Sequence, residues 1–278
     1  MREASLERHK DFPDVWFALL ILAQLLGIEV LLVDGFYDAG ARFSRGDPRY
    51  TGIVTVFACG FVFSLLLSYK NLSYRQLFHP SRRPIGQTLR PLVLPLLATT
   101  AGAVVLATKV NELVVYYFPM SQSELDIFDD MVSGGVTSVI TLCVLAPFIE
   151  EMLFRGLFLR SFLWNYSPAK AIVLSALLFG AAHLNVYQFV TASALGFLSG
   201  WLYFATHSLW PSIFEHALYN GGVMLYYYFD AAPTDNPFVV LAAVIMFAYG
   251  LCRVYGVASA YRDADLDPAR NRRAATGG

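Results

Sequence analysis

Long apolar stretches recur along the whole of this chain, and they limit what it can fold into more than any other feature. About 20 consecutive apolar residues cross a hydrocarbon core roughly 30 Å thick. Hydrophobic residues make up 56% of the chain and charged residues only 15%, whereas soluble domains carry about 25% charged residues. Helices satisfy their backbone hydrogen bonds internally, as a span must. We therefore predict an all-α, polytopic, integral membrane protein with about eight transmembrane helices in one bundle.

The positions of the apolar stretches give the expected spans. They are residues 14–33, 51–69, 90–110, 136–164, 170–189, 191–206, 211–229 and 237–257. Pro91 and Pro95 lie near the start of the third span, where proline is tolerated. Pro147 lies within the fourth span and predicts a bend there.

Basic residues are distributed unequally between the loops. With these spans, most Lys and Arg residues fall on the side that holds both termini. Cytoplasmic loops carry an excess of Lys and Arg, so both termini are predicted to lie in the cytoplasm. The acidic segment 121–130 (SQSELDIFDD) falls on the opposite side and is predicted to be a solvated loop or a short surface helix.

Charge and cysteine content exclude some classes of partner. The net charge is -1 and the pI is near 6.5, which argues against nucleic-acid binding. Cys59, Cys143 and Cys252 are odd in number and far apart, and no C-x-x-C occurs. Neither a disulfide framework nor a cysteine-based zinc site is indicated.

Polar and ionisable side chains interrupt three consecutive C-terminal spans. A charged residue at membrane depth costs about 2.5–3.5 kcal/mol on insertion scales, so each one is a candidate for function. The interruptions are Glu150, Glu151, Arg155, His183, Glu215, His216 and Asn220.

The stretch APFIEEMLFRGLF, residues 146–158, places two glutamates side by side. Glu151 and Arg155 are four residues apart, so they can form an ion pair on one helix face. Glu150 is rotated from Glu151 by about 100° and can point elsewhere. This arrangement suits one carboxylate that orients and another that reacts. The alternative is that Glu151 and Arg155 form an ion pair with a structural role alone.

The histidines lie on the two later polar spans. Phe179 and His183 share one helix face, as do His216 and Asn220. The rise per residue places Glu150, His183 and His216 in the middle or the cytoplasmic half of the bilayer, where they can converge on one cavity.

Glu215 has a separate interpretation. Ser212 and Glu215 follow Pro211 with the spacing of a capping box, which predicts that Glu215 serves the start of its helix.

The three motifs together resemble a known family. In chain order they are E-E-x-x-x-R (Glu150, Glu151, Arg155), F-x-x-x-H (Phe179, His183) and H-x-x-x-N (His216, Asn220). This ordered set, within residues 136–225, resembles the CAAX protease and bacteriocin-processing family of intramembrane endopeptidases, which includes the type II prenyl-protein proteases.

The resemblance implies a role for each motif residue. Glu150 would be the general base that activates water, and His183 would help to hold that water. His216 and Asn220 would bind the oxyanion of the tetrahedral intermediate. This fits the chemistry, because peptide hydrolysis needs a base and oxyanion donors in a water-poor site.

Glu151, Arg155 and Phe179 would support those groups. Members of the family have been described both as metalloproteases and as metal-independent glutamyl proteases. The chain has no H-E-x-x-H motif, yet a glutamate and two histidines can ligate zinc. We expect no obligatory metal, and zinc held by Glu150, His183 and His216 is the alternative.

The sequence thus divides into four segments and leaves three hypotheses. The segments are a cytoplasmic N-terminal segment (1–13), N-terminal helices and loops (14–135), a catalytic core (136–257) and a disordered tail (258–278). The leading hypothesis is an endopeptidase that contacts membrane lipid and cuts a membrane-associated peptide or a prenylated CAAX-type tail. The others are a non-catalytic scaffold of the same fold and a transporter with a proton relay.

Overall fold

The computed structural model describes residues 14–38, 54, 58–60, 62–63, 68, 73–81, 83–229 and 236–266. Every regular element in these residues is helical, so the predicted all-α class is confirmed. The segment 1–13, most of the predicted span 51–69 and residues 267–278 of the tail lie outside the described residues. Residues 258–266, predicted to be disordered, are helical and form the end of the last helix, so the prediction is wrong there.

The helices follow one another closely along the chain. They are α2 (Val15–Asp38), α4 (Tyr74–Phe78), α5 (Ile85–Tyr117), α6 (Gln122–Ser133), α7 (Val136–Ile140), η1 (Thr141–Leu145), α8 (Ala146–Glu151), η2 (Met152–Leu159), α9 (Arg160–Asn165), α10 (Pro168–Ala182), α11 (Val186–Thr206), α12 (Leu209–Phe229) and α13 (Pro237–Leu266). The two η elements are π-helical and lie within one continuous helical segment from α7 to α9.

Five helical segments in the described part are long and apolar enough to cross a membrane. They are Val15–Leu32, Ile85–Tyr117, Val136–Asn165, Val186–Thr206 and Pro237–Asp263. Each contains or overlaps an expected span, so the protein is an integral, multi-pass membrane protein. The total of eight spans stays a prediction, because α10 is shorter and α12 is not among the five.

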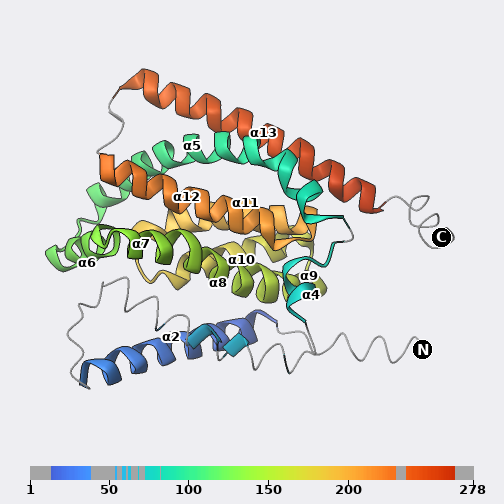
Figure 1. The fold of residues 1–278 in the computed structure, drawn as a ribbon. Helices are drawn as coiled ribbons and strands as arrows, with labels where there is room; N and C mark the ends of the chain where they lie inside the picture. Colours follow the sequence, from blue (N-terminus) through green and yellow to red (C-terminus); the bar gives the residue numbers. More distant parts are fainter. Residues whose placement is uncertain are drawn as a thin grey trace.

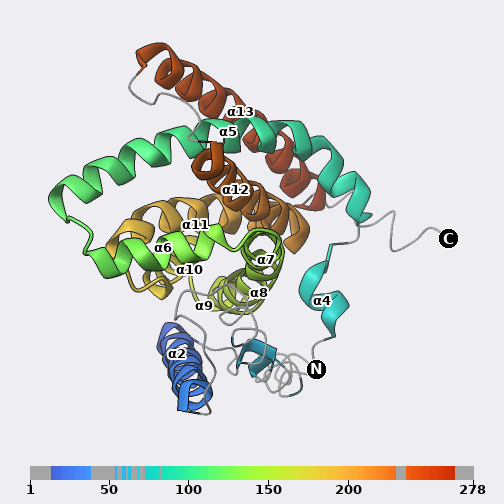
Figure 2. The same cartoon turned by 60° about the vertical axis from the view of Figure 1, so that its left-hand side comes forward.

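The helices lie alongside one another, as Figures 1 and 2 show, with α5 and α13 on one face of the bundle and α2 on the opposite face. The segment from α7 to α9 and helices α10, α11 and α12 lie between these faces. The larger buried apolar cluster joins η2, α10 and α11 to Ala18, Ile21 and Leu25 of α2. Its members come from segments far apart in the sequence, so the core forms only when the whole bundle assembles.

Glycines allow α5 and α13 to approach closely. A Cβ atom on Gly102 would lie 2.4 Å from the carbonyl oxygen of Ala243. A Cβ atom on Gly250 would lie 2.4 Å from the backbone nitrogen of Thr99. No real side chain tolerates these distances, so these two contacts between the helices require glycine. Such close backbone contacts are typical of helix packing within membranes.

The prolines of α5 lie inside the helix. Pro91 has no N–H to donate to the carbonyl group of Gln87, four residues earlier. The Tyr261 hydroxyl of α13 donates to that carbonyl oxygen at 2.9 Å. The partner helix thus satisfies the acceptor that the proline leaves open.

The irregularity expected at Pro147 takes the form of a π-helical stretch. Element η1 ends two residues before this proline. Wider turns of this kind are frequent at functional sites. Here the second one, η2, begins directly after Glu151.

The predicted fifth span, 170–189, is wrong at its end. Helix α10 stops at Ala182, Leu184 has a positive φ of 55°, and α11 begins at Val186. Asn185 caps α11 by accepting from the backbone N–H of Gln188 at 2.8 Å. His183 therefore lies in the turn that ends a 15-residue helix, and not within a longer span. Irregular backbone at membrane depth is tolerated where it lines a cavity.

The acidic segment 121–130 forms most of α6, so the predicted surface helix is confirmed. Ser121 accepts from the backbone N–H of Glu124, and the Glu124 carboxylate accepts from the backbone N–H of Ser121. This capping box fixes the start of the helix. The ring of Phe128 contacts Tyr187 of α11, and the Tyr227 hydroxyl of α12 donates to Asp129. Helix α6 therefore bridges the ends of α11 and α12.

Candidate active site

Glu151 lies at the centre of a fully buried polar network. Its Oε1 accepts from Nη1 of Arg155 at 2.9 Å and lies 3.0 Å from Nδ1 of His216. Arg155 also donates from Nη2 to the carbonyl oxygen of Gly196 at 3.1 Å, and its guanidinium group lies over the ring of Phe179. The ion pair expected from the spacing of Glu151 and Arg155 is confirmed, and its third member is a histidine from another helix.

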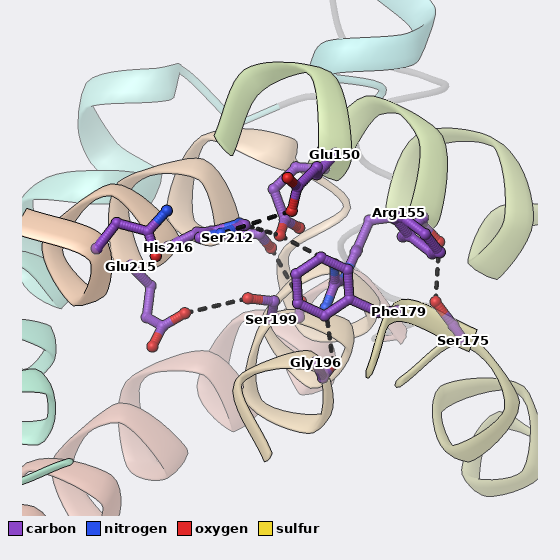
Figure 3. Close-up of polar contacts among 12 residues, drawn as sticks. Glu150, Arg155, Ser175, Phe179, Gly196, Ser199, Ser212, Glu215 and His216 are labelled. Atoms are coloured by element: carbon purple, nitrogen blue, oxygen red, sulfur yellow. Dashed lines mark hydrogen bonds and ion pairs between the residues drawn. The ribbon is translucent and has the colours of Figure 1, made fainter. Parts of the chain in front are cut away.

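Glu151 fixes the direction of the His216 ring. Because Nδ1 faces this carboxylate, Nε2 points the other way and lies 3.8 Å from Oε2 of Glu150 (Figure 3). The edge-on contact between the rings of Phe179 and His216 holds the imidazole from one side. A distance of 3.8 Å is too long for a hydrogen bond. The two groups therefore face each other without a direct bond.

Oε2 of each glutamate is buried without a hydrogen-bond partner, but Glu150 differs from Glu151 in lining a cavity. The side chain of Glu150 as a whole is 29% exposed. Glu151 is fully buried and belongs to the network. The predicted rotation between the two carboxylates thus separates one that belongs to the buried network from one that lines a cavity.

His183 and Asn220 are anchored by backbone carbonyl groups. Nδ1 of His183 lies 3.0 Å from the carbonyl oxygen of Phe179, which can only accept, so Nδ1 carries the proton. The other nitrogen, Nε2, is then the basic one. Nδ2 of Asn220 donates to the carbonyl oxygen of Leu142 in η1 at 2.7 Å. One amide hydrogen of Asn220 therefore stays available.

A cavity of about 380 Å³ gathers the polar residues of three helical segments. Its wall includes Glu150, Phe179, His183, His216 and Asn220. Glu151 and Arg155 lie behind this wall. The structure thus brings the predicted residues together as one inner group and one lining group, while their catalytic roles stay predictions.

Glu215 does not cap its helix, so that prediction is wrong. Helix α12 begins at Leu209, which places Glu215 beyond the first turn. Its Oε2 accepts from the Ser199 hydroxyl at 3.1 Å, and Ser212 donates to the Ser199 carbonyl oxygen at 2.9 Å (Figure 3). Ser199 lies on α11 and Ser212 lies on α12. The spacing of residues within one helix therefore could not reveal the partner of Glu215.

Asn111 of α5 is a cavity residue that the sequence reasoning missed. It lines the same cavity, and its Oδ1 atom is buried without a hydrogen-bond partner. It lies one residue beyond the predicted span 90–110 and next to Glu112, so nothing in the sequence indicated that it faces the other polar residues.

The fit of a metal to these residues is poor. In the described residues, no three His, Cys, Asp or Glu side chains are grouped closely enough to hold a metal ion. Nδ1 of His216 faces Glu151 and Nδ1 of His183 faces a backbone carbonyl group, which leaves Nε2 of both rings for a ligand. The arrangement does not match the three-ligand zinc site considered from the sequence, so no step is derived through a metal.

The region that holds the three motifs is similar to a known protein family. Residues 133–222 match the family model described as type II CAAX prenyl endopeptidase Rce1-like. This part of the chain is similar to the CAAX protease family. The matched region is about a third of the chain, and it includes every residue of the three motifs.

A curated protein is also similar to part of this chain. The chain is 25% identical over 96 residues to "Putative membrane peptidase YdiL" of Bacillus subtilis (strain 168). The aligned region covers 34% of this chain and 39% of the relative. No solved structure matches the chain at a significant level.

Proposed function

We propose that this protein is an intramembrane endopeptidase in which Glu150 activates the attacking water. The observation that carries the proposal is the free Oε2 atom of Glu150 on the cavity wall, 3.8 Å from Nε2 of His216. A water between two polar groups at such a separation can bond to both. A carboxylate with no other partner is suited to accept its proton.

His183 completes the position of the water. Its Nε2 is the basic nitrogen, because Nδ1 faces the Phe179 carbonyl oxygen. One water hydrogen would face Glu150 and the other would face His183. The oxygen lone pair is then directed at the carbonyl carbon of a peptide in the cavity, as a near-attack geometry requires.

His216 and Asn220 would bind the oxyanion that forms. The free amide hydrogen of Asn220 is one donor. Nε2 of His216, which points away from Glu151, is the second donor when the ring carries both protons. Donors fixed in advance in a water-poor cavity stabilise developing charge more than mobile water does.

The bond changes balance within this set of groups. Glu150 takes a proton from water, and the hydroxide oxygen bonds to the carbonyl carbon. As the tetrahedral intermediate collapses, the carbon–nitrogen bond breaks and Glu150 returns the proton to the leaving amine. Glu151 and Arg155 orient His216 throughout. The substrate would be a membrane-associated peptide, and a prenylated CAAX-type tail is the class that the family description names.

The test compares peptide termini in membranes from cells that express the wild type or Glu150→Gln at matched, folded levels. Termini that appear with the wild type and vanish with Glu150→Gln are expected, because the amide cannot accept the proton. Asp263→Asn, which changes an exposed carboxylate on α13, should preserve them. Identical termini in wild type and Glu150→Gln would favour the scaffold hypothesis. Cleavage lost on chelation and restored by Zn²⁺ would contradict a metal-free step.

A further inference from the structure

A further cavity of about 570 Å³ lies beside helix α4, and we call it the α4 cavity. Its wall consists of α4, the loop that follows α4, the start of α5, and Trp210 near the start of α12. It shares no described lining residue with the cavity at Glu150. The α4 cavity is therefore separate from the candidate active site.

The wall of the α4 cavity is positively charged. It carries the guanidinium groups of Arg75 and Arg83, and the described part of the wall carries no carboxylate. No Asp or Glu occurs in the sequence from Ser73 to Asn111. Arg75 is exposed, and the guanidinium carbon of Arg83 lies 3.9 Å from the ring centre of Tyr261. The wall therefore attracts an anion, and guanidinium groups match the geometry of a phosphate group.

Uncharged hydrogen-bond donors belong to the same wall. The Ser81 hydroxyl accepts from the backbone N–H of Arg83 at 3.2 Å, which leaves its own hydrogen for another acceptor. Trp210 lines the cavity, and its Nε1 atom is buried without a hydrogen-bond partner. The rings of Phe78 and Phe148 hold the indole, each with its centre 5.8 Å from that of Trp210. Oxygen atoms of a ligand would give these donors the acceptors that they lack.

Contacts with the rest of the bundle fix the shape of the α4 cavity. Leu77 of α4 is fully buried in the larger apolar cluster. Nδ1 of His79 lies 2.9 Å from the Ser208 hydroxyl oxygen, and Nε2 lies 2.6 Å from the Arg83 carbonyl oxygen. The loop between α4 and α5 is thus attached to the start of α12. Little ordering of the protein would accompany binding, which favours affinity.

The α4 cavity lies where membrane helices begin. Ile85 lines the cavity and is the first residue of the candidate span Ile85–Tyr117. Trp210 directly precedes the predicted span 211–229. Tyrosine and tryptophan are enriched at the level of the lipid headgroups, and Tyr74 lines the cavity together with Trp210. Because Ile85 is 42% exposed, the wall combines charge with an apolar side chain that lipid can cover.

We propose that the α4 cavity binds the phosphate group of an anionic phospholipid. The guanidinium groups neutralise the phosphate charge, while Ser81 and Trp210 donate to its oxygen atoms. Inorganic phosphate shares this chemistry, but it has no chains to meet the apolar side of the wall. Basic pockets beside membrane helices bind lipid headgroups in this way. The proposal goes beyond the peptidase chemistry and does not depend on it.

Binding of short-chain lipids tests the proposal. The protein is purified in a non-ionic detergent and titrated separately with dioctanoyl phosphatidylglycerol, dioctanoyl phosphatidylcholine and inorganic phosphate. Native mass spectrometry counts the molecules bound. One molecule of phosphatidylglycerol is expected to bind saturably. Phosphatidylcholine should bind about tenfold more weakly, because its choline group cancels the phosphate charge, and inorganic phosphate should also bind about tenfold more weakly.

Two variants and a control locate the site. Arg75→Gln should weaken phosphatidylglycerol binding about tenfold, because a charge-assisted hydrogen bond is lost. Trp210→Phe keeps an aromatic ring and removes the N–H, so it should also weaken binding. Lys170→Gln is the matched control, because Lys170 is an exposed basic residue outside the wall of the α4 cavity. It should leave the affinity unchanged.

Several outcomes would overturn the proposal. They are equal affinity for phosphatidylglycerol and phosphatidylcholine, unchanged affinity in Arg75→Gln, and an equal loss in Lys170→Gln and Arg75→Gln. Inorganic phosphate that binds as tightly as phosphatidylglycerol would also overturn it, because the ligand would then be a free anion.

Discussion

At the scale of single residues, two adjacent glutamates have opposite environments. Glu151 is fully buried between Arg155 and His216, whereas the side chain of Glu150 is 29% exposed and lines the cavity. A rotation of about 100° per residue is enough to direct them to different sides of the helix. The inner carboxylate sets the orientation of an imidazole that the outer carboxylate faces.

Removing the buried cation should destabilise the protein strongly. Arg155→Met leaves the Glu151 carboxylate buried without its counter-ion, a change that costs about 3–5 kcal/mol. The fraction that remains monodisperse after heating in detergent should fall at a lower temperature than for the wild type. Arg160→Met is the control, because Arg160 makes one hydrogen bond to the Gln76 carbonyl oxygen near the surface. Equal stability of the two variants would contradict the structural role of the pair.

At the scale of elements, glycines and a tyrosine join α5 to α13. Gly102 and Gly250 bring the two backbones together, and the Tyr261 hydroxyl satisfies the carbonyl group that Pro91 leaves open. Dispersion and hydrogen bonding replace the hydrophobic driving force that lipid does not supply between helices. The packing of this pair is therefore sensitive to single atoms.

Two alanine substitutions on α13 should separate the effect of the helix contact on stability from the effect of helix propensity. Gly250→Ala places a methyl group 2.4 Å from the Thr99 nitrogen, and overpacking of this kind costs about 1–3 kcal/mol. Gly256→Ala lies on the same helix, where a Cβ meets nothing within 4 Å. It should be neutral or stabilising, because alanine favours the helix. Thermal unfolding of both variants measures the difference, and a stabilising Gly250→Ala would contradict the contact.

The cap of α6 should depend on pH. Hydrogen bonds from Ser121 hold the pKa of the exposed Glu124 carboxyl below its ordinary value of 4.5. Because the pKa is lower in the folded state, this contribution is present above the ordinary value and is lost as the pH falls through the lowered one. Amide hydrogen exchange in α6, corrected for intrinsic rates, should therefore accelerate below about pH 4.5. Glu124→Gln keeps the hydrogen bonds without the titration, so the same acceleration in that variant would refute the cause.

At the scale of the whole molecule, the polar residues of the candidate site line a cavity of about 380 Å³ and come from helices that are far apart in the chain. Glu151 and Arg155 lie behind the cavity wall and are fully buried, so packing fixes the position of this inner pair. Rigid support beneath an accessible site is what a preorganised catalytic group requires.

The sequence predicted those features that depend on local spacing. The ion pair of Glu151 with Arg155 follows from helical periodicity, and five spans follow from the length of apolar stretches. The contact of Glu151 with His216 crosses 65 residues, and no local rule could supply it. The same reason explains the wrong interpretation of Glu215, whose partner Ser199 lies on another helix.

The end of α10 was missed for a different reason. Ala181 and Ala182 continue the apolar pattern up to His183, so hydropathy extends the span. Asn185, a favourable N-cap, was the local signal for the start of a new helix. The π-helical stretches had no signal other than Pro147.

The contact between α5 and α13 can form only late in biosynthesis. A ribosome completes α5 long before it synthesises α13, so during translation the nascent α5 has no partner for its glycine surface or for the Gln87 carbonyl oxygen. Only a chain that includes α13 can cover the glycine surface of α5. A truncated chain that ends before Pro237 would lack the contacts that Ala243 makes with Gly102 and that Tyr261 makes with Gln87. The packing of α5 against α13 therefore distinguishes complete chains from fragments.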